Sequence, residues 1–240
     1  KANEPVEPST DYQRFLGLCS HEYFHSWLVK FIRPENFVNY DLNKEGYTSL
    51  LWIFEGFTSY YDDLILLRSG VINQESYIKL LKLQIDRYLQ NPGRAVQTVA
   101  ESSFDAWVKF YRQDENSNNA GTSYYNKGCL VALCLDLGLR LRGSSLDELM
   151  RKLYENAQNG IQVNERTIYE LANDLTGDDW SEQINHLINT TDELPLDQLF
   201  PEFGLSYTLN HDKSLPFGLK LADKPEGVLI QSARRDGSGV

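Results

Sequence analysis

Apolar positions recur every three or four residues along most of the chain up to about residue 190, which is the spacing of one face of an α-helix. The pattern predicts helices over 12–32, 49–67, 73–92, 124–141, 145–157, 165–175 and 180–189. Thr10 with Gln13 and Ser145 with Glu148 form candidate capping boxes at two helix starts. Turn-forming residues fill 33–47 and 114–121, which predicts loops. We therefore expect a mainly α fold over this part of the chain.

The pattern changes near Pro195. Short runs of β-forming residues at 205–209, 218–222 and 227–231 are separated by Asp, Lys, Pro and Gly, and they predict strands. The chain therefore divides into a helical domain over 1–195 and a linker with a small β segment over 196–240.

Composition narrows the choice of partners. The chain has 240 residues, is 41% hydrophobic and carries a net charge of −11, so it can bury a sizeable core but repels nucleic acid and anionic lipid. No apolar run approaches the ~18 residues of a membrane span. Cys19, Cys129 and Cys134 lie in apolar helical segments and are expected to be reduced core thiols. We expect a cytoplasmic protein, with periplasmic or exported placement left open because no initiator Met is present.

Residues 21–25 form an H-E-x-x-H pattern within the first predicted helix. Four residues of helix turn about 400°, so His21 and His25 lie one turn apart on the same face and can share one metal ion. Glu22 lies to the side of this face, where it can act on water as a general base without binding the metal. The alternative is a pair of ordinary core or surface histidines.

A catalytic metal of this kind needs a third protein ligand. Glu55 is the one carboxylate in the apolar and aromatic stretch 51–61, where an unpaired charge would be costly and a cation would offset the cost. It is the best candidate ligand, against the alternative of a partly exposed helix-face glutamate. Cys19 is a competing donor, but it lies two residues before His21 and points to another face, where packing is its expected role.

Three ordered motifs, at 21–34, 51–61 and 123–128, resemble those of the glycyl aminopeptidase family of gluzincin zinc peptidases, relatives of aminopeptidase N and thermolysin. The resemblance covers about residues 10–190 and implies a thermolysin-like helical catalytic subdomain. It implies one zinc ion per chain, held by His21, His25 and Glu55, with Glu22 as the catalytic base. Tyr125 matches the tyrosine that binds the tetrahedral oxyanion in relatives, although its neighbour Tyr124 could face the site instead.

The chain also departs from the family pattern. Leu28 and Phe31 stand where many members have Asn and Arg, which bears on local packing or subsites rather than on the metal. Relatives place a β-sheet before the H-E-x-x-H helix, with a Gly-rich, Glu-containing motif that binds the substrate amine. The 20 residues before His21 contain no such motif, so we expect either that the chain is a fragment of a longer enzyme, with the upstream sheet missing, or that another part of the chain binds the amine. Exopeptidase specificity therefore rests on the resemblance.

The segments 215–219, 227–232 and 236–239 resemble the opening strands of a bacterial PDZ domain, which follows the peptidase domain in this family. The resemblance covers part of such a domain, and a complete one would bind a protein C-terminus.

Taken together, the sequence predicts a zinc-dependent aminopeptidase that hydrolyses peptides after small N-terminal residues such as Gly or Ala. A zinc endopeptidase and a non-catalytic, peptide-binding PDZ protein are the alternatives. The intact Glu22 disfavours the binding protein, because binding alone does not need a base.

Overall fold

The computed structural model describes residues 9–206, 208, 218–225 and 227–236, and these are mainly helical, as predicted. The α-helices are α1 (Thr10–Phe24), α2 (Leu51–Phe54), α3 (Gly56–Arg68), α4 (Gln74–Leu89), α5 (Val99–Phe104), α6 (Ser117–Ala120), α7 (Asn126–Arg140), α8 (Leu146–Gln158), α9 (Thr167–Thr176), α10 (Ser181–Asn189) and α11 (Leu196–Glu202). Short 3-10 helices at Glu35–Phe37 and Pro92–Ala95 and a π-helix, η3 (Ala106–Phe110), complete the helical part.

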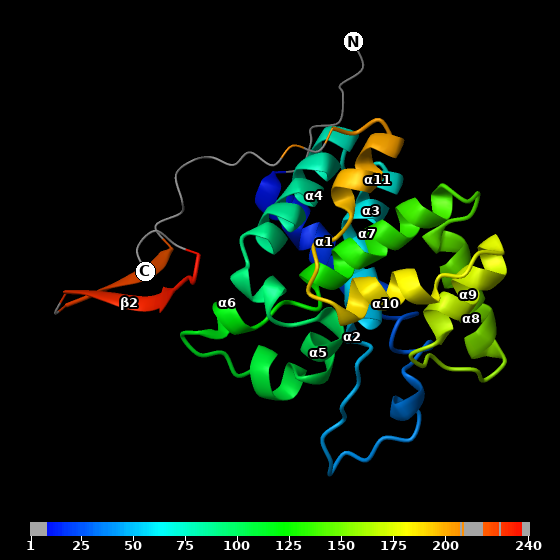
Figure 1. The fold of residues 1–240 in the computed structure, drawn as a ribbon, viewed down its shortest axis with the longest axis horizontal. Helices are drawn as coiled ribbons and strands as arrows, with labels where there is room; N and C mark the ends of the chain where they lie inside the picture. Colours follow the sequence, from blue (N-terminus) through cyan, green and yellow to red (C-terminus); the bar gives the residue numbers. More distant parts are fainter. Residues whose placement is uncertain (1–8, 207, 209–217, 226, 237–240) are drawn as a thin grey trace.

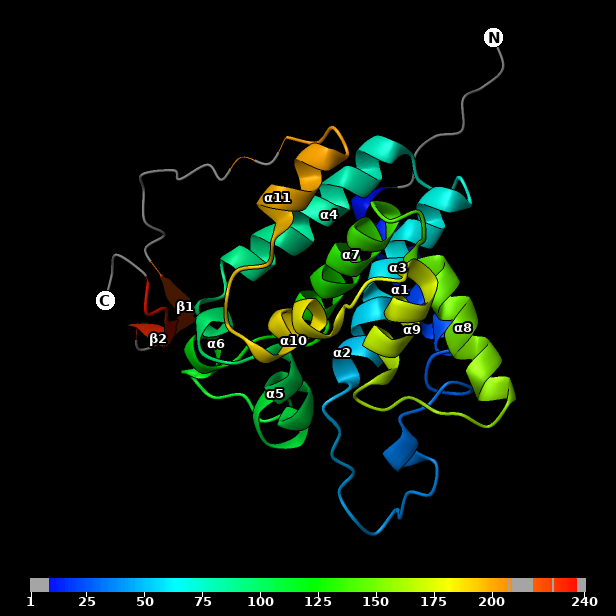
Figure 2. The same ribbon diagram turned by 45° about the vertical axis from the view of Figure 1, so that its right-hand side comes forward.

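Helix α7 runs through the middle of the helical body (Figures 1 and 2). Its residues 127–139 are all buried, because the sequence there is apolar on almost every face. Helices α2, α3, α4, α8 and α11 pack against it. The central helix therefore fixes the relative positions of elements that are far apart in the sequence.

The crossing of α7 with the α2–α3 segment depends on two glycines. A Cβ atom on Gly56 would lie 2.5 Å from the backbone carbon of Gly128, and a Cβ on Gly128 would lie 2.8 Å from the carbonyl oxygen of Trp52. Neither position has room for a side chain, so the two backbones are in direct contact. Glu55 precedes one of these glycines, and Tyr125 lies three residues before the other.

The predicted helix over 12–32 is wrong beyond Phe24, where α1 ends. The chain then turns back, and the amide of Lys30 donates to the carbonyl of His25. Val29 adopts φ 101°, which is uncommon for a β-branched residue and indicates that surrounding packing imposes the turn. Leu28 and Ile32 are buried in the core, so their apolar spacing reflects this packing rather than a longer helix.

Helix ends and breaks also differ from the sequence pattern. Ser9, not Thr10, caps α1 and accepts from the amide of Tyr12. Only half of the second predicted capping box forms: Ser145 accepts from the amide of Glu148, whose carboxylate accepts from Ser144 instead.

The predicted helix over 49–67 is divided at Glu55, which has φ −102° and separates α2 from α3. The predicted loop at 114–121 contains the single turn of α6, and α5 and η3 were not predicted. The sequence predicted that the helical pattern ends near residues 195–201. In the structure this segment forms α11, which buries Leu196 and Phe200 against the helical body. Pro195 and Pro201 lie beside and inside this helix, and proline disfavours helix in predictions from local sequence, so the helix was not predicted.

The strands β1 (Leu219–Lys224) and β2 (Gly227–Ala233) confirm two of the three predicted strands. They pair antiparallel with an irregularity between Lys220 and Leu221, and they lie beside α6 (Figure 1). The side chain of Asn119 joins the two parts by donating to the carbonyl of Ala233, 2.7 Å away. The third predicted strand, at 205–209, lies partly outside the described residues; the PDZ assignment and the domain boundary at 195 stay predictions.

Burial separates the three cysteines. Cys129 and Cys134 are buried, as predicted, whereas Cys19 is exposed on the outer face of α1, so the prediction that it packs in the core is wrong. All three are free thiols. None of the helices in the described ranges combines the length and the apolar character that crossing a lipid bilayer requires.

The contact between the two glycines predicts that Gly128→Ala destabilises the fold by about 2 kcal/mol or more, because the added methyl must separate α7 from α2. Chemical denaturation measures the change. Gly17→Ala is the matched control, since the nearest atom there is the end of the Asp63 side chain, 3.1 Å away and able to move. Equal stability of the Gly128→Ala variant and the native protein would contradict the prediction.

Candidate metal centre

The structure brings together the three predicted ligands. His21 lies in the last turn of α1, His25 follows it as the C-cap in a helical conformation, and Glu55 stands at the break between α2 and α3. The Nε2 atoms of both histidines lie 3.2 Å from the same carboxylate oxygen, Oε2 of Glu55. Their ligand atoms all lie within 4.8 Å of one another, which makes this group able to hold a metal ion.

The second nitrogen of each imidazole is held by the protein. Nδ1 of His21 lies 3.3 Å from Oδ2 of Asp62, and Nδ1 of His25 lies 3.0 Å from the backbone carbonyl of Leu28. Both partners are acceptors, so each Nδ1 carries a proton, and each Nε2 is the atom that can bind a metal once it is deprotonated. Leu28 contacts His25 through its backbone carbonyl. The contact therefore does not depend on the Leu28 side chain, which differs from the residue at this position in many family members.

The two nitrogen–oxygen separations fit a zinc ion. Ligand atoms about 2.0–2.1 Å from a tetrahedral zinc are separated by about 3.3 Å, close to the observed N–O distances. A set of two imidazoles and one carboxylate is also one that catalytic zinc sites use. Cys19, the competing donor, is not part of the cluster among the described residues.

Without a cation, the three ligands form a charge-compensated group. Burial disfavours the imidazolium of His21, but the hydrogen bonds to Asp62 and Glu55 outweigh it and raise its pKa to about 9. The hydrogen bond to Glu55 likewise raises the pKa of His25. Burial alone would raise the pKa of Glu55, yet the two histidines lower it to about 2. The site is thus built for positive charge beside Glu55.

Glu22 lines the same cavity of about 500 Å³ as the three ligands, together with Asp62 and Tyr125. Its side chain is on the exposed side of α1, as its place in the H-E-x-x-H pattern predicts. The carboxylate therefore adjoins the ligand group without being a member of it.

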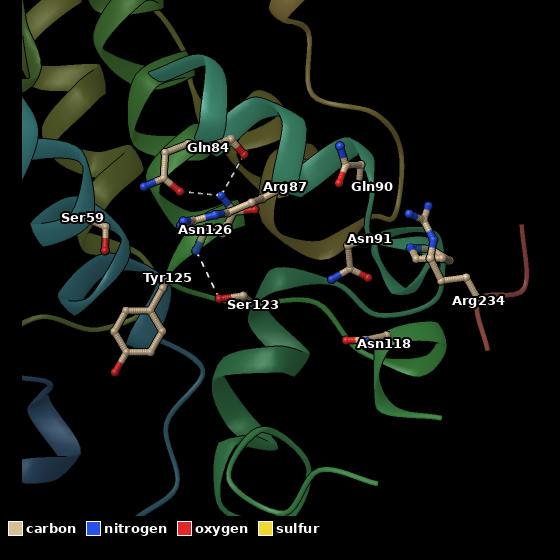
Figure 3. Close-up of a pocket in the computed structure, with 11 residues that line it drawn as sticks. Ser59, Gln84, Arg87, Gln90, Asn91, Asn118, Ser123, Tyr125, Asn126 and Arg234 are labelled. Atoms are coloured by element: carbon tan, nitrogen blue, oxygen red, sulfur yellow. Dashed lines mark hydrogen bonds between the residues drawn. The ribbon is translucent and has the colours of Figure 1, made fainter. Parts of the chain in front are cut away.

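Of the two neighbouring tyrosines, Tyr125 borders the ligand cavity. Its ring centre lies 6.2 Å from that of His21, and in Figure 3 its ring points away from Arg87 and Asn126. Tyr124 is 1% exposed, and its hydroxyl donates to that of Tyr111 at 3.2 Å. Burial and the neighbouring Tyr111 and Glu55 raise the pKa of Tyr125, so its hydroxyl keeps its proton at neutral pH.

Sequence reasoning missed two groups that touch the site. Asp62 orients His21, and its position seven residues after Glu55 returns to the same helix face after two turns, which was a usable signal. Tyr111 places its hydroxyl 3.4 Å from that of Tyr125, but it follows the π-helix and no pattern in the sequence pointed to it.

Two histidines in H-E-x-x-H spacing and a distant glutamate define a candidate mononuclear metal centre on a helical scaffold. Residues 14–131 match the M61 glycyl aminopeptidase family. This match, over 118 of the 240 residues, confirms the resemblance carried by the three motifs.

The chain is also similar to a crystal structure of an aminopeptidase N family protein from Idiomarina loihiensis, with 37% sequence identity and a TM-score of 0.88. The similarity covers 98% of this chain and 43% of that protein, so the chain spans less than half its length. A comparison with functionally curated proteins finds no match.

The contact between Asp62 and His21 predicts that Asp62→Ala weakens metal binding about 10- to 100-fold, because the imidazole loses its orienting acceptor. Competition with a chromophoric chelator measures the dissociation constant. Asp63→Ala removes the adjacent carboxylate and is the matched control, expected to leave the affinity within about 3-fold of the native value. Equal losses in both variants would show that charge near α3, not the hydrogen bond, supports the ion.

Proposed function

We propose that this chain is the catalytic part of a zinc-dependent aminopeptidase. The observation that carries the proposal is the convergence of His21 Nε2 and His25 Nε2 on one oxygen of Glu55, with both Nδ1 atoms held in place. The family match over 14–131 supports peptide hydrolysis, and the name glycyl aminopeptidase supports a substrate with an N-terminal Gly. Ala, the next smallest residue, is included in the proposal.

His21, His25 and Glu55 would hold the zinc ion. Zinc bound by two imidazoles and a carboxylate polarises the scissile carbonyl and lowers the pKa of water toward about 7. The ligands leave the exposed side of the group, which borders the cavity, available to the substrate.

Glu22 has the position of a general base. Its carboxylate lines the cavity at the edge of the ligand group, where it can take a proton from the attacking water and pass it to the leaving amine. Tyr125 faces the same cavity with a protonated hydroxyl, which can donate a hydrogen bond to the oxyanion that develops on the carbonyl. The two residues thus supply a proton acceptor and a hydrogen-bond donor to the same cavity.

Exopeptidase action is the part of the proposal that rests on the family and on the aminopeptidase N relative. The test compares a glycyl peptide with its N-acetylated form in the intact protein. Loss of hydrolysis on acetylation supports the aminopeptidase, whereas equal rates would identify an endopeptidase.

The position of Glu22 predicts that Glu22→Gln retains one bound zinc per chain but lowers kcat by roughly 10²- to 10⁴-fold, because the base is removed and the ligands remain. Metal analysis and steady-state assays on glycyl peptides measure both quantities. Full metal content with unchanged turnover would favour the non-catalytic, peptide-binding alternative.

Tyr125 lines the ligand cavity and Tyr124 does not. We therefore expect Tyr125→Phe to lower kcat by about 10-fold to 10³-fold with little change in KM, because a hydrogen bond to the oxyanion forms only in the transition state. Tyr124→Phe is the matched control, since that hydroxyl is directed to Tyr111. A larger loss in Tyr124→Phe would reverse the assignment.

A further inference from the structure

A second cavity, of about 590 Å³, opens beside the candidate metal centre. We call it the Trp107 cavity. Its apolar walls are formed by Val29, Phe37, Leu42, Leu51, Ala106 and Trp107. Its size lies within the range of roughly 300–1,000 Å³ that is typical of pockets for small organic groups.

The Trp107 cavity adjoins the candidate metal centre. Glu55 lines both the ligand cavity and the Trp107 cavity. Tyr111 also lines the Trp107 cavity, and its hydroxyl lies 3.4 Å from that of Tyr125. A peptide with its scissile bond at the ligand group would therefore have an adjacent side chain within reach of these walls.

The outer wall is an aromatic side chain that is both exposed and held in place. Trp107 is 54% exposed, and its Nε1 donates to the carbonyl of Gly46 at 2.9 Å. It lies on the π-helix η3, a form that occurs frequently at functional sites. A large aromatic surface that is already ordered binds an apolar group at little cost in conformational entropy.

Two of the charged side chains around the rim contact local partners. Lys44 pairs with Asp41 at 3.7 Å, and the guanidinium of Arg33 donates to the carbonyl of Lys30 at 2.9 Å. The apolar walls are therefore the part of the cavity that we expect to contact a bound side chain. By contrast, the cavity of about 550 Å³ on the Tyr125 side is lined by amide side chains and by Arg87 (Figure 3). The two sides of the metal centre therefore favour different chemistry.

We propose that the Trp107 cavity is the subsite for a bulky apolar side chain on the residue that follows the scissile bond. This inference rests on the proposed function, because a substrate with a small N-terminal residue must present its bulky side chain on the second residue. The preferred substrate class is then a peptide that begins with Gly or Ala followed by a residue such as Phe or Leu.

Binding to the zinc-loaded, intact Glu22→Gln protein tests the subsite without turnover. Isothermal titration with Gly-Phe-amide is expected to give a dissociation constant about 10-fold or more below that of Gly-Gly-amide, because the benzyl group leaves water for the apolar walls. Equal affinities would overturn the proposal. Tighter binding of Phe-Gly-amide than of Gly-Phe-amide would overturn the assignment to the second residue.

Substitutions in the same background locate the preference. Trp107→Ala is expected to reduce the Gly-Phe-amide advantage about 5-fold while leaving Gly-Gly-amide within about 2-fold. Leu42→Ala, at a side chain that is 87% exposed, should reduce it in the same direction without affecting the fold. Val108→Ala, the next position in η3, lines a different cavity and is the matched control. An unchanged advantage in both Trp107→Ala and Leu42→Ala would overturn the subsite.

Hydrolysis by the native protein separates the two proposals. Cleavage of Gly-Phe-amide faster than Gly-Gly-amide supports both of them. Binding selectivity without hydrolysis of either peptide would overturn the peptidase and identify the Trp107 cavity as a peptide-binding pocket without a scissile bond. Hydrolysis without binding selectivity would overturn only the subsite.

Discussion

The contact between the backbones at Gly56 and Gly128 is the constraint on which the site depends. It brings the α2–α3 break against the start of α7, so that a carboxylate from one segment and a phenol from the other border one cavity. Helix α1 then packs on α3 and carries the two imidazoles to the same place. Bulkier residues at this crossing would push α7 away from α2 and α3 and so move Tyr125 away from Glu55.

Once the helices are packed, the attraction between opposite charges determines how the side chains of His21, His25 and Glu55 are arranged. A buried carboxylate is expensive, and here two imidazoles offset its cost by sharing a single oxygen. The same arrangement keeps the three ligand atoms together, so that much of the ordering needed to hold an ion is achieved when the chain folds. Positive charge, from protons or from a metal, is what the group requires.

The three candidate ligands could be predicted from the sequence, whereas several of the elements and side chains around them could not. The spacing of His21 and His25 and the isolated charge of Glu55 are local signals, and helical periodicity survived in α4, α7, α8, α9 and α10. The early end of α1, the exposure of Cys19 and the helix at 196–202 depend on contacts with distant residues, which local preference does not contain. The π-helix that carries Trp107 and precedes Tyr111 is likewise a product of packing.

The two histidines are oriented by unlike means, and this makes their tolerance of genetic change unequal. His21 depends on a side chain, so one codon change at position 62 can release it. His25 donates to a main-chain carbonyl, which every amino acid supplies. Substitutions at position 28 therefore leave this hydrogen bond intact, provided the turn is preserved. A lineage could thus replace a polar residue there with leucine and keep its second imidazole in register.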